Sequence, residues 1–137
     1  MPILTTKGVY GLMAICQIAN ASKFAPISIK DISDKTGVSK GYLEQILNDL
    51  RNAKIISSKK GKNGGYFLRK PAQKISFYDI FHTLEKDFKM TNLDVKDEIL
   101  QQFFKNGDKK LEEVFNSSIS DIIKTTEDSS KNLDFAI

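Results

Sequence analysis

The chain has 137 residues, 40% of them hydrophobic and 28% charged, and this composition indicates one soluble globular domain with a real core. Its longest apolar runs are too short to span a membrane, and its N-terminus carries no recognisable secretory leader. The single cysteine, Cys16, excludes an internal disulfide and is typical of a reducing compartment. We therefore expect a cytoplasmic protein without a membrane anchor.

The net charge of +4 is unevenly distributed along the chain. Residues 1–84 hold 13 Lys and Arg against 5 Asp and Glu, whereas residues 85–137 hold 8 against 12. Eight basic residues and no acidic residue lie between positions 51 and 74. Such a block favours contact with a phosphate backbone. A charged hairpin that only faces solvent is the alternative interpretation.

A first helix is predicted from Thr5 or Thr6, either of which can serve as N-cap, to about Asn20. Apolar residues recur along this segment at helical spacing and predict its buried stripe: Val9, Leu12, Met13, Cys16 and Ala19. Because Cys16 belongs to this stripe, we interpret it as a small buried hydrophobe. A redox-sensing thiol is the alternative, and it would require exposure and a lowered pKa.

A short helix is predicted to begin at Ser28, with Asp31 three residues later as in a capping box, and to end at Gly37. A tight turn at residues 38–39 then leads into another helix over residues 39–51. Two helices joined in this way are typical of a helix-turn-helix unit, whose second helix enters the major groove of DNA.

The helix over residues 39–51 has two different faces. Four apolar residues follow the i, i+3, i+4, i+7 spacing of a buried stripe: Leu43, Ile46, Leu47 and Leu50. The opposite face carries small or hydrogen-bonding residues: Lys40, Gly41, Glu44, Gln45 and Asn48. Gln and Asn can pair with adenine edges and Glu can accept from cytosine, so this face is predicted to read bases.

Two short strands are predicted at Ile55–Ser58 and Tyr66–Leu68, and Pro71 closes the hairpin that they form. The loop between the strands combines cations with residues that favour turns: Lys59, Lys60, Lys62, Asn63, Gly64 and Gly65. A polar helix face followed by a cationic hairpin is the arrangement that a winged helix offers to DNA.

Ser76 and Asp79 form a second capping-box pattern, which predicts the start of a further helix. Residues 86–107 are weakly patterned, with a short helix around residues 99–104. From about Asp108 to Thr126 we expect a longer amphipathic helix that forms a dimer seam through Leu111, Val114, Phe115, Ile119, Ile122 and Ile123. Residues 128–137 are expected to form a disordered tail.

Three segments together resemble the Rrf2 family of bacterial winged-helix transcription regulators: TTKGVYGL (5–12), YLEQIL (42–47) and GKNGGYFL (61–68). The resemblance implies a mainly α fold, with a winged helix-turn-helix domain over residues 1–85, a linker and long dimerisation helix over residues 86–127, and the tail. It also implies a cytoplasmic homodimer that binds double-stranded DNA at a palindromic operator.

The resemblance also assigns roles to single residues. The family's base-reading positions fall on Gly41, Glu44 and Gln45, and a basic wing residue that enters the minor groove falls on Lys60. The family's wing contains a proline that is absent here, where Asn63 can take a positive φ. The expected DNA-binding set is Lys7, Ser28, Ser39, Lys40, Gly41, Tyr42, Glu44, Gln45, Asn48, Lys59, Lys60, Lys62, Asn63, Gly64 and Gly65.

Members of the family that bind an iron–sulfur cluster carry three cysteines between the fourth helix and the dimerisation helix. Residues 85–110 of this chain contain neither cysteine nor histidine, and Cys16 and His82 are too few for a cluster. We interpret His82 as an ordinary residue of a helix surface. We therefore expect no metal and no cofactor.

The sequence thus predicts a DNA-binding transcription regulator, most simply a repressor, and no enzyme, since it has no phosphate-binding glycine loop and no catalytic constellation. The alternative is a winged-helix module for protein interaction or redox sensing without sequence-specific DNA binding. That alternative predicts an apolar recognition face, whereas four residues of this face are polar: Lys40, Glu44, Gln45 and Asn48. The sequence identifies no effector.

Overall fold

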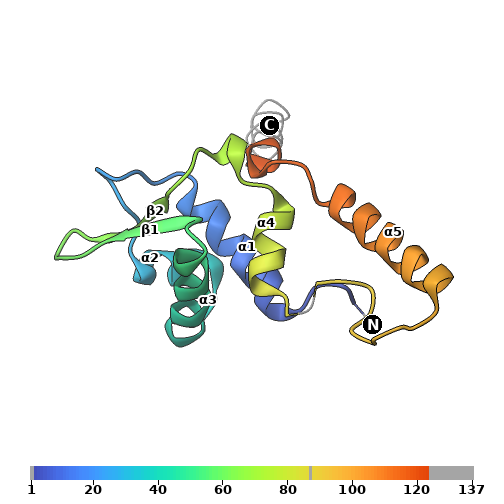
Figure 1. Cartoon of the computed structure of the whole chain (residues 1–137). Coiled ribbons are helices and arrows are strands. Elements are labelled where there is room, and N and C mark those ends of the chain that lie inside the picture. Colours follow the sequence, from blue (N-terminus) through green and yellow to red (C-terminus); the bar gives the residue numbers. More distant parts are fainter. Residues whose placement is uncertain (1, 87, 124–137) are drawn as a thin grey trace, which may run out of the picture.

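The computed structural model describes residues 2–86 and 88–123, and its elements form a helical body with a small β-hairpin on one side (Figure 1). The helices and strands, in chain order, are α1 (Thr6–Ile18), α2 (Ile29–Thr36), α3 (Lys40–Asn52), β1 (Ile56–Lys59), β2 (Gly65–Leu68), the 3₁₀ helix η1 (Ala72–Lys74), α4 (Phe77–Leu84) and α5 (Glu98–Val114).

Short polar side chains fix where the helices begin, as the sequence predicts. The hydroxyl oxygens of Thr5, Ser28 and Ser39 each accept a backbone N–H from the first turn of α1, α2 and α3. Ser76 and Asp79 form the complete reciprocal capping box of α4. Gly37 ends α2 in the left-handed conformation, with φ of 78°. The predicted helix-turn-helix is therefore confirmed.

The hairpin of β1, β2 and the loop between them, called the wing below, is tied to the helices by backbone hydrogen bonds. The strands pair antiparallel from Ile56 opposite Leu68 to Lys59 opposite Gly65, within one residue of the predicted strands. Ile27, just before α2, exchanges two backbone bonds of 2.8 and 3.0 Å with Tyr66. A Cβ on Gly65 would collide with the Ile27 carbonyl, so this close approach requires glycine.

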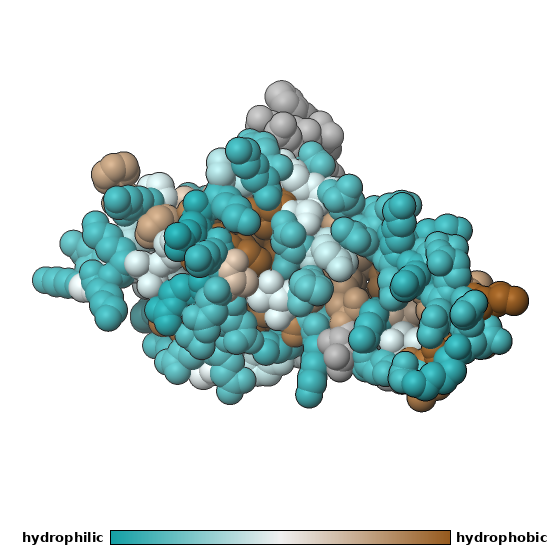
Figure 2. All heavy atoms as spheres, viewed as in Figure 1, coloured by the Kyte–Doolittle hydropathy of each residue, from teal (hydrophilic) through white to brown (hydrophobic). Residues whose placement is uncertain are grey.

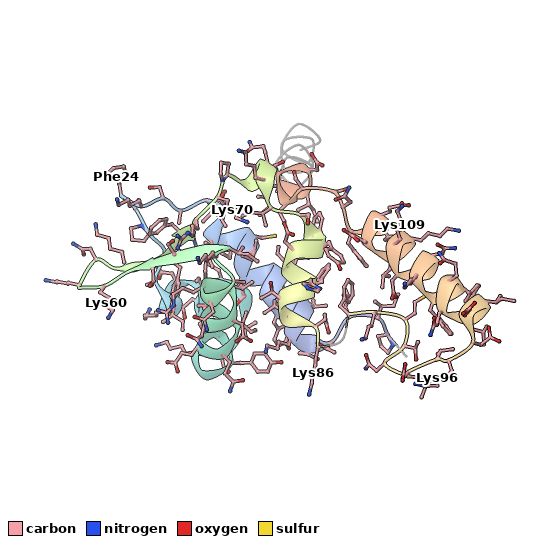
Figure 3. All side chains as sticks on the ribbon, viewed as in Figure 1. Phe24, Lys60, Lys70, Lys86, Lys96 and Lys109 are labelled. Carbon is pink, nitrogen blue, oxygen red and sulfur yellow. The ribbon has the colours of Figure 1, made fainter. Side chains whose placement is uncertain are left out.

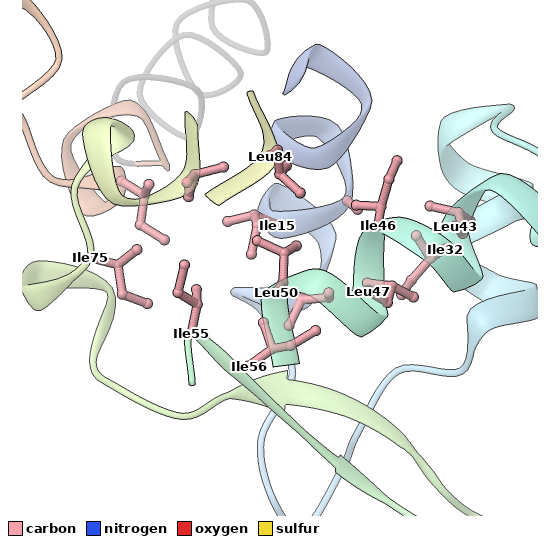
Figure 4. Close-up of a cluster of buried hydrophobic side chains, with 14 of the residues drawn as sticks. Ile15, Ile32, Leu43, Ile46, Leu47, Leu50, Ile55, Ile56, Ile75 and Leu84 are labelled. Carbon is pink, nitrogen blue, oxygen red and sulfur yellow. The ribbon is translucent and has the colours of Figure 1, made fainter. Parts of the chain in front are cut away.

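The core lies where α1, α2, α3 and α4 meet above the base of the wing (Figure 4). The predicted stripe of α3 is fully buried along its whole length: Leu43, Ile46, Leu47 and Leu50 each have no exposed surface. Ile15 of α1, Ile32 of α2 and Ile80 of α4 complete the centre of the cluster. Burying these side chains supplies most of the driving force for the fold.

The stripe predicted for α1 is wrong. Val9 is 42% exposed, and Leu12, Met13, Cys16 and Ala19 are only partly buried, whereas the buried face is formed by Gly8, Gly11, Ala14, Ile15 and Ile18. The reason is close packing, because a Cβ on Gly11 would collide with Leu84, and one on Gly8 would collide with Glu85. Small residues let α1 lie directly against the end of α4, and a search for large apolar residues does not detect such a face.

The predicted helix over Asp108–Thr126 is also wrong. The helix α5 starts ten residues earlier than predicted, ends at Val114, and helical structure resumes only at residues 119–123. The break arises because residues 115–119 hydrogen-bond back to the start of α4: Phe115 O accepts from Tyr78 N at 2.8 Å, and Ile119 N donates to Ile75 O at 2.9 Å. Residues 124–126 and the tail at 128–137 lie outside the described residues.

This return of the chain divides the predicted dimer seam. Ile119 is fully buried in the chain's own core, while Leu111, Phe115 and Ile123 are partly buried, and Val114 and Ile122 are 70% and 38% exposed. In contrast, none of the 17 described residues of α5 is buried, and the helix stands apart from the body in Figure 1. Ile119 thus belongs to the domain core, and α5 is left uncovered within one chain.

Replacing Ile119 by alanine should lower the free energy of unfolding by about 2–5 kcal/mol, because it leaves a cavity in the core. The exposed Glu113→Ala change on α5 serves as the control and should change it by less than about 0.5 kcal/mol. Urea unfolding followed by circular dichroism at one protein concentration measures both values. Equal effects of the two substitutions would contradict the placement of Ile119.

Candidate nucleic-acid interface

The polar face of α3 is exposed, as predicted from the sequence. Lys40, Gly41, Glu44, Gln45 and Asn48 are all exposed, while the opposite stripe of the same helix is buried. A Cβ on Gly41 would meet no protein atom within 4 Å, so this glycine leaves open space at the first turn of the helix. The face therefore offers donors and acceptors that an incoming base edge can reach.

Arg51 connects this face to the wing, and the predicted DNA-binding set does not include it. Its Nη2 donates to Asn48 Oδ1 at 3.0 Å, and its Nη1 lies 3.5 Å from Ser58 Oγ on β1. The guanidinium is thereby held between α3 and the wing. The signal in the sequence was its position three residues after Asn48, on the same face of the helix.

An open cavity of about 320 Å³ lies between the start of α2 and the wing. Its lining brings together Ser28, Arg51, Lys59 and Lys60, from three elements of the fold. The Ser28 hydroxyl accepts from Asp31 N at 3.1 Å, so it acts here as the N-cap of α2. Cations and a helix N-terminus around one cavity are suited to a phosphate group.

The tip of the wing is a tight turn in which Gly64 N donates to Gly61 O at 3.0 Å. Gly61 takes the positive φ, 113°, whereas we suggested above that Asn63 can take it. Lys62 and Asn63 occupy the exposed corners of this turn, and Lys60 extends into solvent at the end of the molecule (Figure 3). Among the described residues, no carboxylate lies within ion-pair distance of Lys59, Lys60 or Lys62.

Lys7, Tyr42 and Ser39 of the predicted set also have partners inside the molecule. Lys7 Nζ lies 2.6 Å from Asp49 Oδ2, an ion pair that joins α1 to α3. The ring of Tyr42 packs edge-on against Tyr10, with ring centroids 5.7 Å apart. Ser39 Oγ accepts from Tyr42 N at 3.3 Å as the N-cap of α3. The first two contacts orient α3 relative to α1, and the third caps α3 itself.

The residues present do not fit an iron–sulfur cluster. The whole sequence has one cysteine, and within residues 2–86 and 88–123 no three His, Cys, Asp or Glu side chains are grouped to hold a metal ion. Cys16 lies partly buried on α1, and His82 stacks on Tyr78 with ring centroids 5.3 Å apart. Burial raises the pKa of the Cys16 thiol, which disfavours a reactive thiolate.

The comparisons with known proteins agree with this geometry. Residues 4–132 match the model of the Rrf2 family, described as iron-dependent transcriptional regulators. Over 88 residues the chain is 35% identical to the HTH-type transcriptional regulator IscR of Escherichia coli O1:K1, a match covering 64% of this chain and 54% of that protein. The chain thus spans about half the length of the curated relatives it matches.

Solved structures give the same result over most of the chain. IscR of T. potens aligns with a TM-score of 0.74 at 31% identity, covering 92% of this chain and 89% of that one. CymR, the global cysteine regulator of B. subtilis, aligns with a TM-score of 0.76 at 28% identity, covering 91% and 98%. These neighbours confirm the winged-helix fold. No helix among the described residues is long and apolar enough to cross a bilayer.

The raised pKa of Cys16 predicts slow alkylation. In the native protein, reaction with iodoacetamide at neutral pH should be about tenfold slower than in the urea-unfolded chain. Its rate should also reach half-maximum at a higher pH than in urea, since burial disfavours the charged thiolate. A midpoint below that of the unfolded chain would instead support a redox-sensing thiol.

Proposed function

The chain belongs to the Rrf2 family of transcriptional regulators, and we propose that it regulates transcription by binding a dyad-symmetric DNA operator as a homodimer. In this proposal α3 is the recognition helix and the wing contacts the flanking backbone or minor groove. The observation that carries the proposal is the single exposed surface that joins the polar face of α3, Arg51 and the lysines of the wing, which have no ion-pair partner among the described residues.

The two parts of this surface supply different kinds of contact. Glu44 and Gln45 project from the middle of α3, where side chains reach base edges in the major groove. The cations around the cavity between α2 and the wing neutralise phosphates and release counterions, which gives affinity without sequence information. A dimer that occupies a promoter in this way excludes other proteins from it, so repression is the simplest outcome.

Exposed apolar side chains on the first half of α5 support the homodimer. Ile99, Leu100 and Phe103 are 81%, 48% and 61% exposed, although they lie within one turn of each other. A helix of 17 residues with no buried side chain is marginal by itself in water. Figure 2 shows hydrophobic atoms at the end of α5 farthest from the wing. Pairing with the α5 of a second copy would cover them.

Substituting Gln45 by alanine should weaken binding to the selected operator by about 1–3 kcal/mol and leave binding to unrelated DNA nearly unchanged. Selection from a random DNA pool at stated salt supplies the operator, and fluorescence anisotropy measures both affinities. A selection without any dyad motif would contradict the proposed function. An equal loss for all sequences would mean that Gln45 does not read bases.

Substituting Lys60 by alanine should reduce the dependence of the binding constant on salt by about one counterion. Lys109→Ala on α5, at the opposite side of the molecule in Figure 3, is the control and should leave the slope unchanged. Titrations at several salt concentrations give both slopes. If the two variants behave alike, Lys60 lies away from the DNA.

Replacing Phe103 by aspartate should convert the dimer into a folded monomer, because it places a charge in the proposed seam. Gln102→Asp, on the neighbouring exposed position, is the matched control and should stay dimeric. Light scattering coupled to size-exclusion chromatography measures the mass of each variant. A Phe103→Asp protein that remains dimeric would place the interface elsewhere.

A further inference from the structure

A second cavity, of about 780 Å³, lies away from the DNA-facing surface. It is enclosed by the N-terminal segment 2–5, the linker that follows α4, and the second half of α5. Its size falls in the range of small-molecule pockets. Apolar side chains from all three segments line it: Ile3, Phe88, Met90, Leu111 and Val114.

Charged groups around this cavity are predominantly positive. Lys86, Lys89 and Lys110 line it, and no carboxylate of the described residues lies within ion-pair distance of any of them. Among the described residues that line it, the one carboxylate belongs to Glu85, which is only 6% exposed. Its Oε1 accepts from Thr5 N at 2.7 Å, so it is engaged with the start of α1.

We propose that this cavity binds a small amphipathic organic anion, with an apolar body and one carboxylate. The apolar body displaces water from Phe88, Met90 and Leu111, and the carboxylate pairs with the lysine ammonium groups. An apolar helix face from a second copy would leave these three cations unpaired, which makes it the poorer occupant. The proposed dimer seam uses the other half of α5 and leaves the cavity accessible.

The contacts around the cavity lead directly to α3. Glu85 and Thr5 line the cavity and hold the first turn of α1. Two residues after Thr5, Lys7 makes the 2.6 Å ion pair with Asp49 of α3. A ligand that shifts the Glu85–Thr5 contact would therefore move the anchor of α3. We expect it to change operator affinity, a consequence that rests on the proposed function.

Methionine methyl resonances of the full chain give a direct test of binding, with octanoate as the probe. Met90 lines the cavity and Met13 on α1 does not, so in protein labelled with ¹³C-methyl methionine the Met90 resonance should shift on saturation and the Met13 resonance should not. Met90→Leu assigns the peak. The neutral analogue octanamide should bind about tenfold more weakly, because it cannot pair with lysine.

Two lysine variants on α5 make the test specific. Lys110→Met should weaken octanoate binding about fivefold, whereas Lys109→Met, whose lysine does not line this cavity, should leave it unchanged. Lack of a saturable Met90 shift up to about 10 mM octanoate would overturn the proposal. This is the result expected if a second copy of the chain filled the cavity. Equal binding of octanamide, or equal effects of the two variants, would overturn the anionic ligand class.

Regulation is measured separately. Fluorescence anisotropy of the operator DNA gives the affinity of the protein for its operator with and without saturating octanoate. A several-fold change in operator affinity that Lys110→Met removes would support the link to α3, and an unchanged affinity would overturn it. The methyl resonances report binding without DNA, so failure of the ligand site and failure of the proposed function are distinguishable.

Discussion

Burial of one helical stripe determines the orientation of the proposed DNA-binding face of α3. Leu43, Ile46, Leu47 and Leu50 have no exposed surface, and together they represent several kcal/mol of hydrophobic free energy. Because helix geometry places the polar residues of α3 on the opposite side, this burial forces Glu44 and Gln45 outward. Rotating α3 would expose the stripe, so its burial sets which side of the helix faces outward.

The wing depends on the same body through its backbone. The two hydrogen bonds between Ile27 and Tyr66 fix the hairpin against the start of α2, and Gly65 is needed because no Cβ fits beside the Ile27 carbonyl. Arg51 adds a side-chain connection from α3 to β1. The distance between the recognition surface and the wing cations is therefore set by the fold, as a ligand of fixed geometry such as duplex DNA requires.

The part of the chain after α4 is held to the body differently from the winged-helix part. The chain leaves the body after Phe88, forms the exposed helix α5, and returns at residues 115–119 to pair with the start of α4. Ile119 thereby completes the core of a domain whose other members all come before residue 85. A helix anchored at both ends but buried nowhere is well placed to join a second copy on one side and a ligand on another.

The sequence by itself determined the elements whose signals are local. The caps at Thr5, Ser28 and Ser76, the stop at Gly37, the stripe of α3 and the two strands of the wing were predicted, because each depends on residues close together in the chain. The polar face of α3 followed from the same periodicity, and so did the candidate base-reading residues.

Only the tertiary structure decided which apolar residues were core and which side chains were already engaged. The glycine face of α1 is buried because Leu84 and Glu85 pack against it, and the break after Val114 exists because residues 115–119 bond to α4. The Lys7–Asp49 pair and the bridging position of Arg51 likewise join residues from separate elements. These features depend on contacts between distant segments, and helical periodicity within one segment carries no information about them.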